Sequence, residues 1–412
     1  MRILIVTQYF WPENFRINDL VRELQSRGHD LTVLTGKPNY PSGTVFPDFR
    51  ADPARFASFE GVEVIRVPMM PRARGSLRLI LNYLTFVLGA VSFGIFKLRA
   101  RSFDLVFIYE PSPITVAIPA ILIGRLKKIP VVFWVLDLWP ETLAALGVVR
   151  SKQVLSLIGR GVRVIYDNCT LVLGQSRSFV PSISRYCSDP TKVRYYPSWA
   201  EQMFVSDGVK KAPEVPEVSD AFTIVFAGNI GESQDMPTLL RAAECLKEDT
   251  RVRWVFVGDG RKFHWVRAEV ESRGLSDNVL LVGRHPIERM PSFYAHADAL
   301  LVSLKSDPVF SLVIPAKLQT YLMSGIPILG MLDGEGAQVI RDSGAGLSCP
   351  AGDSEALVTC ILDLMASSVE ERAEMGRLGR QYASAEFDRD TLISRLEGFF
   401  SEARIRFRRF GT

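Results

Sequence analysis

The 412-residue sequence is poor in the residues that build metal centres and disulfide frameworks. Its four histidines never occur in an HExxH spacing, and its five cysteines are scattered without a CxxC pair: Cys169, Cys187, Cys245, Cys349 and Cys360. Zinc sites need closely spaced ligands, and disulfide frameworks need paired cysteines. We therefore predict buried free thiols in a reducing compartment and no metal site.

A second absence concerns glycine after the first strand-like run. "RILIVTQYF" is followed by "WPEN", and no glycine occurs before Gly28. A dinucleotide-binding turn needs G-x-G-x-x-G at that point, so a nicotinamide dehydrogenase is disfavoured. Tyr9, Phe10 and Trp11 instead suit the wall of another ligand site, or ordinary packing. The net charge of +4 is too small to indicate a nucleic-acid partner.

Acidic residues are absent from a long apolar stretch in the first half of the chain. Between residues 79 and 98 only Lys97 is charged, and basic residues flank both ends: Arg72, Arg74, Arg78, Arg99 and Arg101. The stretch could almost span a bilayer, but it lies between two soluble-looking strands, so burial or docking on a membrane surface is favoured. Each basic residue near anionic lipid contributes about 1 kcal/mol, which favours docking. We therefore predict a membrane-docking segment at residues 72–101.

The start of the chain gives an expectation about its location. "MRILIVTQYF" lacks the charged and apolar layout of a signal peptide. With the docking segment, this predicts a cytoplasmic protein that is peripheral on the inner face of the cytoplasmic membrane.

Apolar, β-branched runs alternate with amphipathic stretches along the whole chain. The first half contains "DLTVLTG", "VEVIRVPM", "DLVFIYE", "VVFWVLDLWP" and "TLVLGQS". The second half contains "FTIVFAGNI", "VRWVFVGDG", "NVLLVG", "DALLVSL" and "IPILGML". This alternation is typical of α/β proteins with parallel sheets buried on both faces. It predicts two Rossmann-like doubly wound domains, at residues 1–200 and 221–385, that face each other across a cleft. The residues between them, 201–220, are rich in Pro, Glu, Ser and Lys and are predicted to form a linker.

Glycine-containing loops follow the strands of the second half. "FAGNIGESQDM" supplies Gly228 and Gly231, "VGDG" supplies Gly258, and "VGRHP" follows a third strand. Backbone amides in such loops, and the helix N-termini that follow them, can hold an anion. Lys317 stands in the first turn of a later predicted helix, where the macrodipole is already positive. We expect Lys317 and that helix N-terminus to converge on one phosphate; a solvated lysine beside a proline-capped helix is the alternative.

These motifs resemble those of the GT-B glycosyltransferases, and within them family 4, the retaining enzymes that use nucleotide sugars. The resemblance covers nearly the whole chain, through "LQSRGHDLTVLT", "FAGNIGESQDMPTLLRAA", "VFVGDG", "VLLVGRHPIERMPSFYAHADALLVSL", "IPAKLQTYLMSGIPIL" and "GAGLSCPAGD". "YFWPEN", "DLWPE", "GNIGESQ" and "IPAK" look like the bacterial branch that includes the fucosamine transferases of O-antigen and colanic acid assembly.

The resemblance implies that the second domain holds a UDP-sugar and the first binds the acceptor. It also implies that the last helix, 386–412, packs back on the first domain or touches lipid. The residues implied for the nucleotide pocket are Gly228, Asn229, Gly231, Gly258, Gly283 and, beside the uracil, Arg284. Asp137 occupies the region where many relatives place a histidine or aspartate near the transferring sugar, and Glu141 lies within one helical turn. A carboxylate there would hold sugar hydroxyls or take the acceptor proton; capping of a helix that begins near Pro140 is the alternative for Asp137.

The sequence departs from the family at charged positions. The usual Arg and Lys of the diphosphate site, and two glutamates that many members carry eight positions apart, fall on uncharged residues: Asn229, Gln234, Leu312 and Thr320. An uncompensated diphosphate in a low-dielectric cleft would cost on the order of several kcal/mol, so Lys317 becomes the remaining counter-charge. Glu335 is the candidate for contacting the donor sugar or ribose in place of a lost glutamate.

Together these features predict a hexosyltransferase-type glycosyltransferase with a UDP-sugar as co-substrate and no cofactor. Metal independence is expected because no DxD element stands where a metal-dependent transferase would carry one. The enzyme would move a sugar, such as an N-acetylated deoxyhexosamine, to a lipid-linked (polyprenyl diphosphate) saccharide in O-antigen or lipopolysaccharide synthesis, with retention. Asp137, Glu141 and Lys317 are the catalytic candidates. Two alternatives stay open: a UDP-N-acetylhexosamine 2-epimerase of the same fold, and a catalytically silent, membrane-associated assembly partner.

Overall fold

The computed structural model describes residues 1–73, 75–200, 202–204 and 208–410 and divides the chain into two compact units. The first unit comprises Met1–Tyr196 together with the chain from Ile393 onward, and the second comprises Pro197–Leu392. Arg74 and parts of the predicted linker, residues 201 and 205–207, lie outside the described residues. The described remainder of the linker belongs to the second unit, where Val215 is buried, so this unit begins before residue 221.

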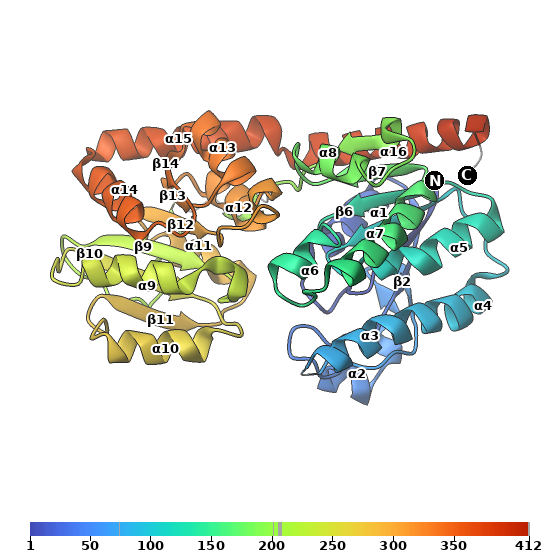
Figure 1. Cartoon of the computed structure of the whole chain (residues 1–412), viewed down its shortest axis with the longest axis horizontal. Helices are drawn as coiled ribbons and strands as arrows, with labels where there is room; N and C mark the ends of the chain where they lie inside the picture. The colour runs from blue at the N-terminus through green and yellow to red at the C-terminus, as the bar shows by residue number, and fades with distance from the viewer. Residues whose placement is uncertain (74, 201, 205–207, 411–412) are drawn as a thin grey trace. The chain divides into compact units, whose positions relative to one another are not determined.

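The first unit is built on an eight-stranded sheet (Figure 1). Its strand order is β3 (Ser58–Phe59), β4 (Val62–Arg66), β2 (Asp30–Thr35), β1 (Arg2–Val6), β5 (Leu105–Glu110), β6 (Val131–Val135), β7 (Leu171–Gly174) and β8 (Val193–Tyr195). All neighbouring strands are parallel except β3 and β4. The central strands are runs of buried Val, Ile, Leu and Phe, as expected for a parallel sheet that is covered on both faces.

Helices cover both faces of this sheet. The crossovers that advance along the sheet toward β8 are right-handed, so their helices all lie on one face. These are α3 (Ser76–Gly89), a π-helical turn (Ala90–Gly94), α4 (Ile95–Leu98), α5 (Ala117–Lys127), α6 (Glu141–Ala145), α7 (Lys152–Asp167) and α8 (Phe179–Ser184). The crossover from β1 back to β2 puts α1 (Arg16–Ser26) on the opposite face, and the short α2 (Pro47–Ala51) follows β2. On that face α16 (Arg389–Phe410) packs against the sheet, with the Phe400 ring 5.4 Å from that of Phe107.

The apolar stretch predicted to dock on a membrane forms α3, the π-helical turn and α4. Among the described residues one helix, Arg78–Leu98, is long and apolar enough to cross a membrane, and 28% of its apolar window is buried. Asn82 on its buried side accepts a hydrogen bond from Gln8 Nε2 at 2.7 Å and donates to Met70 O at 2.6 Å. These contacts make the stretch a packed helix of the first unit that leaves another side exposed.

The second unit contains a six-stranded parallel sheet. Its strand order is β11 (Val279–Gly283), β10 (Val252–Val257), β9 (Phe222–Ala227), β12 (Ala299–Ser303), β13 (Ile328–Met331) and β14 (Gly346–Cys349). One face packs against α9 (Met236–Cys245), α10 (Phe263–Ser272) and α14 (Ser354–Ala366); the other packs against α11 (Met290–Tyr294), α12 (Ala316–Ser324), α13 (Gly334–Ser343) and α15 (Val369–Glu386). The prediction of two Rossmann-like doubly wound domains is confirmed.

All five cysteines are free thiols. Cys169, Cys187 and Cys349 are buried, whereas Cys245 is exposed at the end of α9. The prediction of buried thiols is therefore wrong for Cys245.

Candidate functional site

Backbone hydrogen bonds join the carboxyl ends of β9, β10 and β11 and bring three of the predicted glycines together. Gly228 N donates to Val257 O at 2.9 Å, and Gly258 N donates to Gly283 O at 2.7 Å. Gly228 and Gly258 have φ values of 141° and 143°, which side-chain-bearing residues rarely adopt. A Cβ on Gly258 would overlap the carbonyl oxygen of Gly228, so glycine is required where these two loops meet.

Asn229 and Gly231 lie on the same sheet edge. The loop that carries them is fixed to the next loop by a hydrogen bond from Ile230 N to Asp259 O at 2.9 Å. The Asn229 side chain lies against Gly231 and Gly260, because a Cβ added to either glycine would contact the amide group. The carboxyl ends of β9 and β10 therefore form a glycine-lined surface, and the Asn229 amide group lies against it.

Helix α12 positions Lys317 over the end of β9. The hydroxyl of Tyr321 accepts a hydrogen bond from Ala227 N at 2.9 Å and donates one to Ala227 O at 3.2 Å. Because residues four apart share one face of a helix, Lys317 lies above the same strand end. The helix begins at Ala316 without a side-chain cap, and Leu318 N donates to Pro315 O at 2.8 Å. The amides of Ala316 and Lys317 are the ones left for solvent or a ligand.

The Lys317 ammonium has a polar contact and an aromatic contact. Its Nζ donates to Gln234 Oε1 at 2.8 Å and lies 3.7 Å from the centroid of the Phe226 ring. Burial lowers the pKa of Lys317 to about 7, because desolvation disfavours the charged form. No acidic side chain among the described residues balances this charge. The side chain as a whole is half-buried, so it is not a freely solvated lysine, and its role toward a phosphate stays a prediction.

Two further predicted donor residues lie on other elements. Arg284 follows β11, the edge strand of the sheet, and its side chain is exposed. Glu335 is half-buried in the first turn of α13. The contacts of Lys317 include neither residue. Roles for Arg284 and Glu335 in donor binding stay predictions.

In the first unit, the ends of β5 and β6 bring two carboxyl groups together. Glu110, the last residue of β5, is fully buried, and its Oε2 accepts a hydrogen bond from Asp137 N at 3.3 Å. Asp137 Oδ2 accepts another from Trp139 Nε1 at 3.3 Å. The N-cap of α6 is Pro140, so the alternative interpretation of Asp137 as a helix cap is wrong.

Burial raises the pKa of both carboxyl groups. The pKa of Glu110 lies well above its usual range, first because of burial and second because of the charge of Asp137. Burial also raises the pKa of Asp137, while hydrogen bonds from Thr142, Trp139 and Ser112 oppose the rise. Buried carboxyl groups this close together retain a proton more readily than isolated ones.

Helix α3 reaches this carboxyl pair through Ser112. The backbone of Ser112 has a φ of 121°, a strained value for a residue other than glycine. Its side chain interacts with Tyr83 of α3 and with Asp137. Strained residues of this kind cluster at functional sites, which makes the ends of β5 and β6 the candidate site of the first unit.

Glu141 lies in the first turn of α6 and is engaged elsewhere. Its Oε1 accepts a hydrogen bond from Tyr186 OH at 3.2 Å, and its Oε2 is buried. The hydrogen bonds of Asp137 do not include Glu141. The structure thus pairs Asp137 with Glu110, a residue that the sequence analysis missed. An acidic residue at the end of the apolar run "DLVFIYE" was the available signal.

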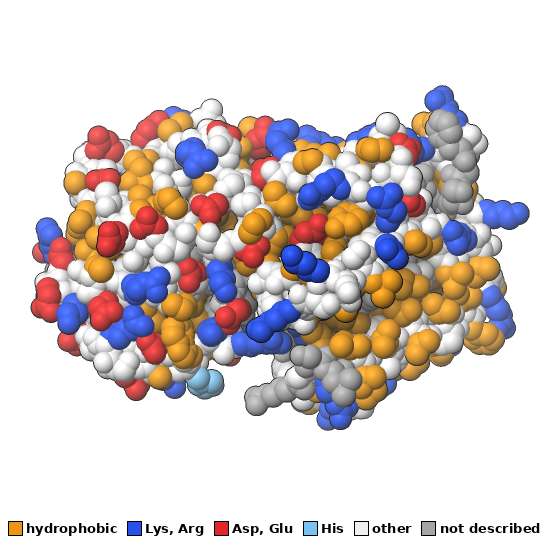
Figure 2. Space-filling model, in the orientation of Figure 1, with side chains coloured by type: hydrophobic (Ala, Val, Ile, Leu, Met, Phe, Trp, Pro, Cys, Tyr) orange, Lys and Arg blue, Asp and Glu red, His pale blue; other side chains and the backbone are white. Residues whose placement is uncertain are grey.

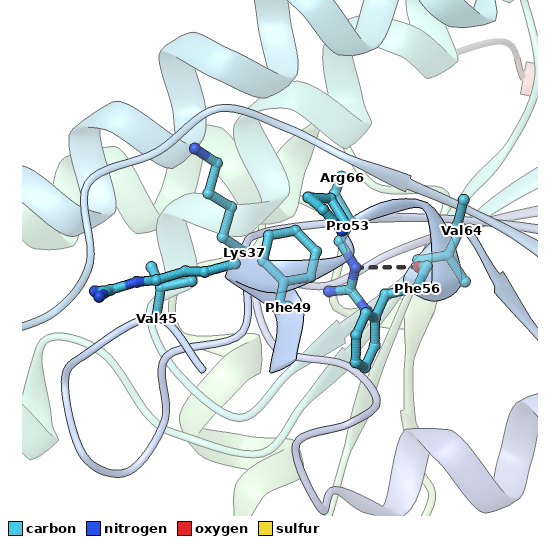
Figure 3. A pocket seen from close by; sticks show the side chains of 9 residues that line it. Lys37, Val45, Phe49, Pro53, Phe56, Val64 and Arg66 are labelled. Carbon is cyan, nitrogen blue, oxygen red and sulfur yellow. Dashed lines mark hydrogen bonds between the residues drawn. The ribbon is translucent and has the colours of Figure 1, made fainter. Parts of the chain in front are cut away.

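A cavity of about 530 Å³ lies beside the ends of β2 and β4 in the first unit (Figure 3). It is lined by Lys37, Val45, Phe49, Arg50, Pro53, Phe56, Ala57, Val64 and Arg66. Arg66 donates to Gly36 O at 2.9 Å and to Phe56 O at 3.3 Å, which ties two loops together. Figure 3 shows the Lys37 ammonium pointing away from Arg66. The cavity is therefore an apolar hollow with a basic edge, and its cations do not meet at one point.

Two family models match the chain, one in each half. The model described as "Glycosyl transferases group 1" matches residues 210–382, and the "Glycosyl transferase 4-like domain" matches residues 14–199. Together they cover most of the chain, and each model falls almost entirely on one of the two parallel-sheet units. The chain is a GT-B glycosyltransferase of family 4. It is accordingly an enzyme of the hexosyltransferase type.

Relatives of this glycosyltransferase include proteins of surface-polysaccharide synthesis. It is 23% identical over 348 residues to WcaI of Escherichia coli (strain K12), a protein named as a colanic acid biosynthesis glycosyl transferase; the match covers 79% of this chain and 82% of WcaI. Anabaena Alr3699/HepE, solved in complex with UDP and glucose, superposes with a TM-score of 0.70 at 14% identity and covers 97% of this chain and 99% of its own. WaaG, a glycosyltransferase involved in lipopolysaccharide biosynthesis, gives 0.68 at 13% identity, covering 97% and 99%. The two solved structures establish the fold.

The contact between Lys317 and Gln234 bears on how this glycosyltransferase departs from its family. Gln234 occupies a position where the family resemblance places a cation of the diphosphate site. Its side chain is hydrogen-bonded to Lys317, which lies 83 residues away in the sequence. The structure therefore places the Lys317 ammonium beside the position where the resemblance predicts a cation, and its role toward a diphosphate stays a prediction.

Proposed function

We propose that this glycosyltransferase moves a sugar from a UDP-sugar to a lipid-linked (polyprenyl diphosphate) saccharide, with retention, at the inner surface of the cytoplasmic membrane. The product would belong to O-antigen or a related surface polysaccharide. An N-acetylated deoxyhexosamine is the sugar that the branch resemblance favours. The complex of HepE with UDP and glucose, and the colanic acid assignment of WcaI, support the donor and product classes.

The donor proposal is carried by one observation: Lys317 is half-buried, and its ammonium lies over the Phe226 ring with no acidic partner among the described residues. A diphosphate beside it would restore its charge, because an opposite charge favours the ionised form. The glycines at 228 and 258 leave space for backbone amides to approach phosphate oxygens. As the glycosidic bond loosens, negative charge grows on the leaving UDP, and these groups would stabilise it. We propose that these groups take the place of a metal ion in stabilising the leaving UDP.

We assign the acceptor chemistry to Asp137, with Glu110 as its positioning residue. The carboxyl edge of a parallel sheet is where ligands of α/β folds bind, and Asp137 follows β6 at that edge. Its carboxylate would take the acceptor proton or hold sugar hydroxyls. Glu110 touches Asp137 through the backbone amide and through its charge, so it would act through Asp137 rather than on substrate.

The membrane proposal follows from the two sides of α3. Asn82 and Phe86 are fully buried, whereas Ile80, Leu84 and Leu88 are exposed. The helix can therefore place an apolar side in the lipid interface while Asn82 stays hydrogen-bonded to the loops that follow β1 and β4. A lipid-linked acceptor would be presented at the same surface.

Thermal unfolding with UDP tests the donor site. A ligand that binds only the folded state raises its stability by RT ln(1 + [L]/Kd). A charge-assisted hydrogen bond contributes about 1.5–3 kcal/mol, so Lys317→Ala should weaken UDP binding roughly 10- to 100-fold. Lys317→Arg should retain most of the affinity, and Lys247→Ala, at an exposed lysine of the same unit, should retain all of it. Equal UDP affinity in Lys317→Ala and the wild type would contradict the phosphate role.

Product analysis separates the alternatives. Purified enzyme is incubated with a panel of UDP-sugars and with lipid-linked saccharide extracted from membranes. Release of UDP together with growth of the saccharide supports transfer. Formation of a 2-epimer from UDP-N-acetylhexosamine without any acceptor would favour the epimerase, and UDP binding without release from any donor would favour the assembly partner.

A further inference from the structure

Exposed apolar side chains gather on one helical layer of the first unit. Of the seventeen large hydrophobic side chains that are exposed among the described residues, twelve lie between positions 80 and 164. They are Ile80, Leu84, Leu88, Phe93, Phe96, Ile118, Leu126, Leu146, Val148, Val154, Leu157 and Val164. Figure 2 shows hydrophobic side chains concentrated over α3, α4 and α5. The exposed surface therefore extends well beyond the predicted docking segment 72–101.

The helices that carry these side chains are neighbours in one layer. Chain crossovers place α3, α4, α5 and α7 on the same face of the sheet, and α5 contacts both the π-helical turn and α7. On α7, Leu157 is 65% exposed, whereas Val162 and Ile165 are buried against the unit. On α5, Leu126 is 61% exposed, whereas Ile123 is buried. Each helix thus buries one apolar side in the core and exposes further apolar side chains to solvent.

The charges on α3, α4, α5 and α7 are almost all positive. The helical residues 76–98, 117–127 and 152–167 include Arg78, Lys97, Arg125, Lys127, Lys152, Arg160 and Arg163, and their one acidic residue is Asp167. Asp167 is engaged by Ser188, whose backbone amide donates to Oδ1 at 2.7 Å and whose hydroxyl donates to Oδ2 at 2.8 Å. Arg78, Lys97, Lys152 and Arg160 form no ion pair with an acidic side chain among the described residues.

We propose that α5 and α7 join α3 and α4 in a single docking face for a membrane surface rich in anionic phospholipid. The inference deepens the proposed function, on which it rests for the presence of a lipid-linked acceptor. Apolar side chains interspersed with unpaired lysines and arginines match a bilayer interface, where acyl chains and anionic headgroups lie within a few ångströms of each other. A second copy of the chain would bring two positive faces together, so like-charge repulsion disfavours a homodimer here.

Cosedimentation of the full chain with vesicles tests the face. The probes are phosphatidylcholine vesicles and vesicles of phosphatidylcholine with phosphatidylglycerol. Leu157→Glu on α7 and Leu126→Glu on α5 should each weaken binding to the anionic vesicles about tenfold or more, since each removes one inserted apolar side chain and adds a negative charge. Arg160→Gln should weaken it about fivefold, the equivalent of about 1 kcal/mol. Val369→Glu is the matched control, because Val369 is 68% exposed on the second unit.

The outcomes either support or overturn the proposal. Loss of binding in the α5 and α7 variants, with Val369→Glu unchanged and with weaker binding at high salt, supports a docking face made by α3, α4, α5 and α7. Normal binding by Leu157→Glu and Leu126→Glu, with loss only in Leu84→Glu, would reduce the face to α3 and overturn it. A lipid-free dimer that Leu157→Glu dissociates would show a protein partner instead. UDP-dependent thermal stabilisation of the same variants is measured separately, so a failure of the donor proposal is distinguishable from a failure of docking.

Discussion

A buried ammonium is unstable without compensation, because burial removes the water that solvates its charge. Lys317 has only partial compensation, from the Gln234 carbonyl oxygen at 2.8 Å and from the face of the Phe226 ring. Its pKa of about 7 means that the free enzyme holds this residue partly neutral at physiological pH. An anion that binds beside Lys317 would therefore increase the fraction of the side chain that is charged.

This coupling predicts a pH dependence of UDP binding. The pKa of Lys317 is lowered from 10.5 to about 7 in the free folded protein, and a bound diphosphate raises it again. Binding above pH 7 must then take up a proton, so affinity should fall by up to about tenfold per pH unit as pH rises from about 7 to 9. The terminal phosphate of UDP, with a pKa of about 6, is already largely ionised in this range. Titration calorimetry at several pH values measures the effect.

Lys317→Arg is the control for this prediction. An arginine stays charged throughout the range, so its UDP affinity should be nearly independent of pH. A wild-type profile as flat as that of Lys317→Arg would show that Lys317 keeps its proton without UDP.

At Glu110 we expect a stabilising substitution. Folding raises the pKa of this carboxyl above the 4.5 of an unfolded chain, so the protonated form is the one that the fold favours. Stability from this group is present at low pH and is lost as pH rises above about 4.5. Glu110→Gln keeps an acceptor for Asp137 N and cannot ionise, so its unfolding temperature should exceed that of the wild type at pH 7–8 and match it near pH 4.

Turnover distinguishes a positioning role from a purely structural one. If Glu110 changes the pKa of Asp137, Glu110→Gln should shift the pH profile of turnover as well as the stability. A more stable variant with an unchanged profile would limit Glu110 to packing. A wild type that is more stable than Glu110→Gln at pH 8 would mean that Glu110 is ionised in the folded protein and that neighbouring groups stabilise its charge.

At the scale of elements, periodicity identified most strands and failed for the shortest. The long apolar runs became β1, β2, β4, β5, β6 and β7 in the first unit and β9 to β13 in the second. The missed strands, β3, β8 and β14, are two to four residues long and lie at or beside a sheet edge. Such strands have too few residues to show a pattern, and their pairing is decided by a neighbour already in place.

The glycine turn after β10 gives a test at the same scale. Gly258→Ala would put a Cβ into the carbonyl of Gly228 at a φ of 143°, so we expect a loss of about 2–4 kcal/mol in stability of the second unit and a loss of UDP binding. Gly274→Ala is matched, because its φ is 65° and nothing lies within 4 Å of the added Cβ. It should lose only about 1 kcal/mol from backbone strain and retain UDP binding. Urea unfolding and UDP titration of both variants check the difference.

At the scale of the whole molecule, the chain leaves the first unit at Tyr196 and returns to it at Ile393. The returning part of α16 is a component of the first core: Leu396, Phe400 and Ala403 are fully buried. His29 Nε2 and Glu397 Oε1 lie 2.7 Å apart across the same contact. The first unit is therefore complete only when the last helix has been synthesised, whereas the second is continuous in sequence.

This organisation predicts that the two units respond to different changes. Phe400→Ala removes a fully buried ring, so we expect the first unit to lose about 3–5 kcal/mol. Ile405→Ala, at a side chain of the same helix that is 56% exposed, should have little effect. UDP should raise the unfolding temperature of the second unit alone. Differential scanning calorimetry would contradict this organisation if Phe400→Ala lowered, or UDP raised, both transitions equally.

By itself the sequence determined what depends on neighbouring residues: two parallel-sheet domains from the apolar runs, glycine turns after strands, and an apolar helix with basic flanks. Only the tertiary structure decided which distant side chains meet. Lys317 reaches Gln234 across 83 residues, and Glu110 reaches Asp137 across 27. Local pattern cannot predict such pairs, because they depend on the register of neighbouring strands and on how each helix packs over a strand end. The exposed apolar side chains of α5 and α7 could not be predicted from local pattern either, because which side of a helix is buried depends on its neighbours in the fold.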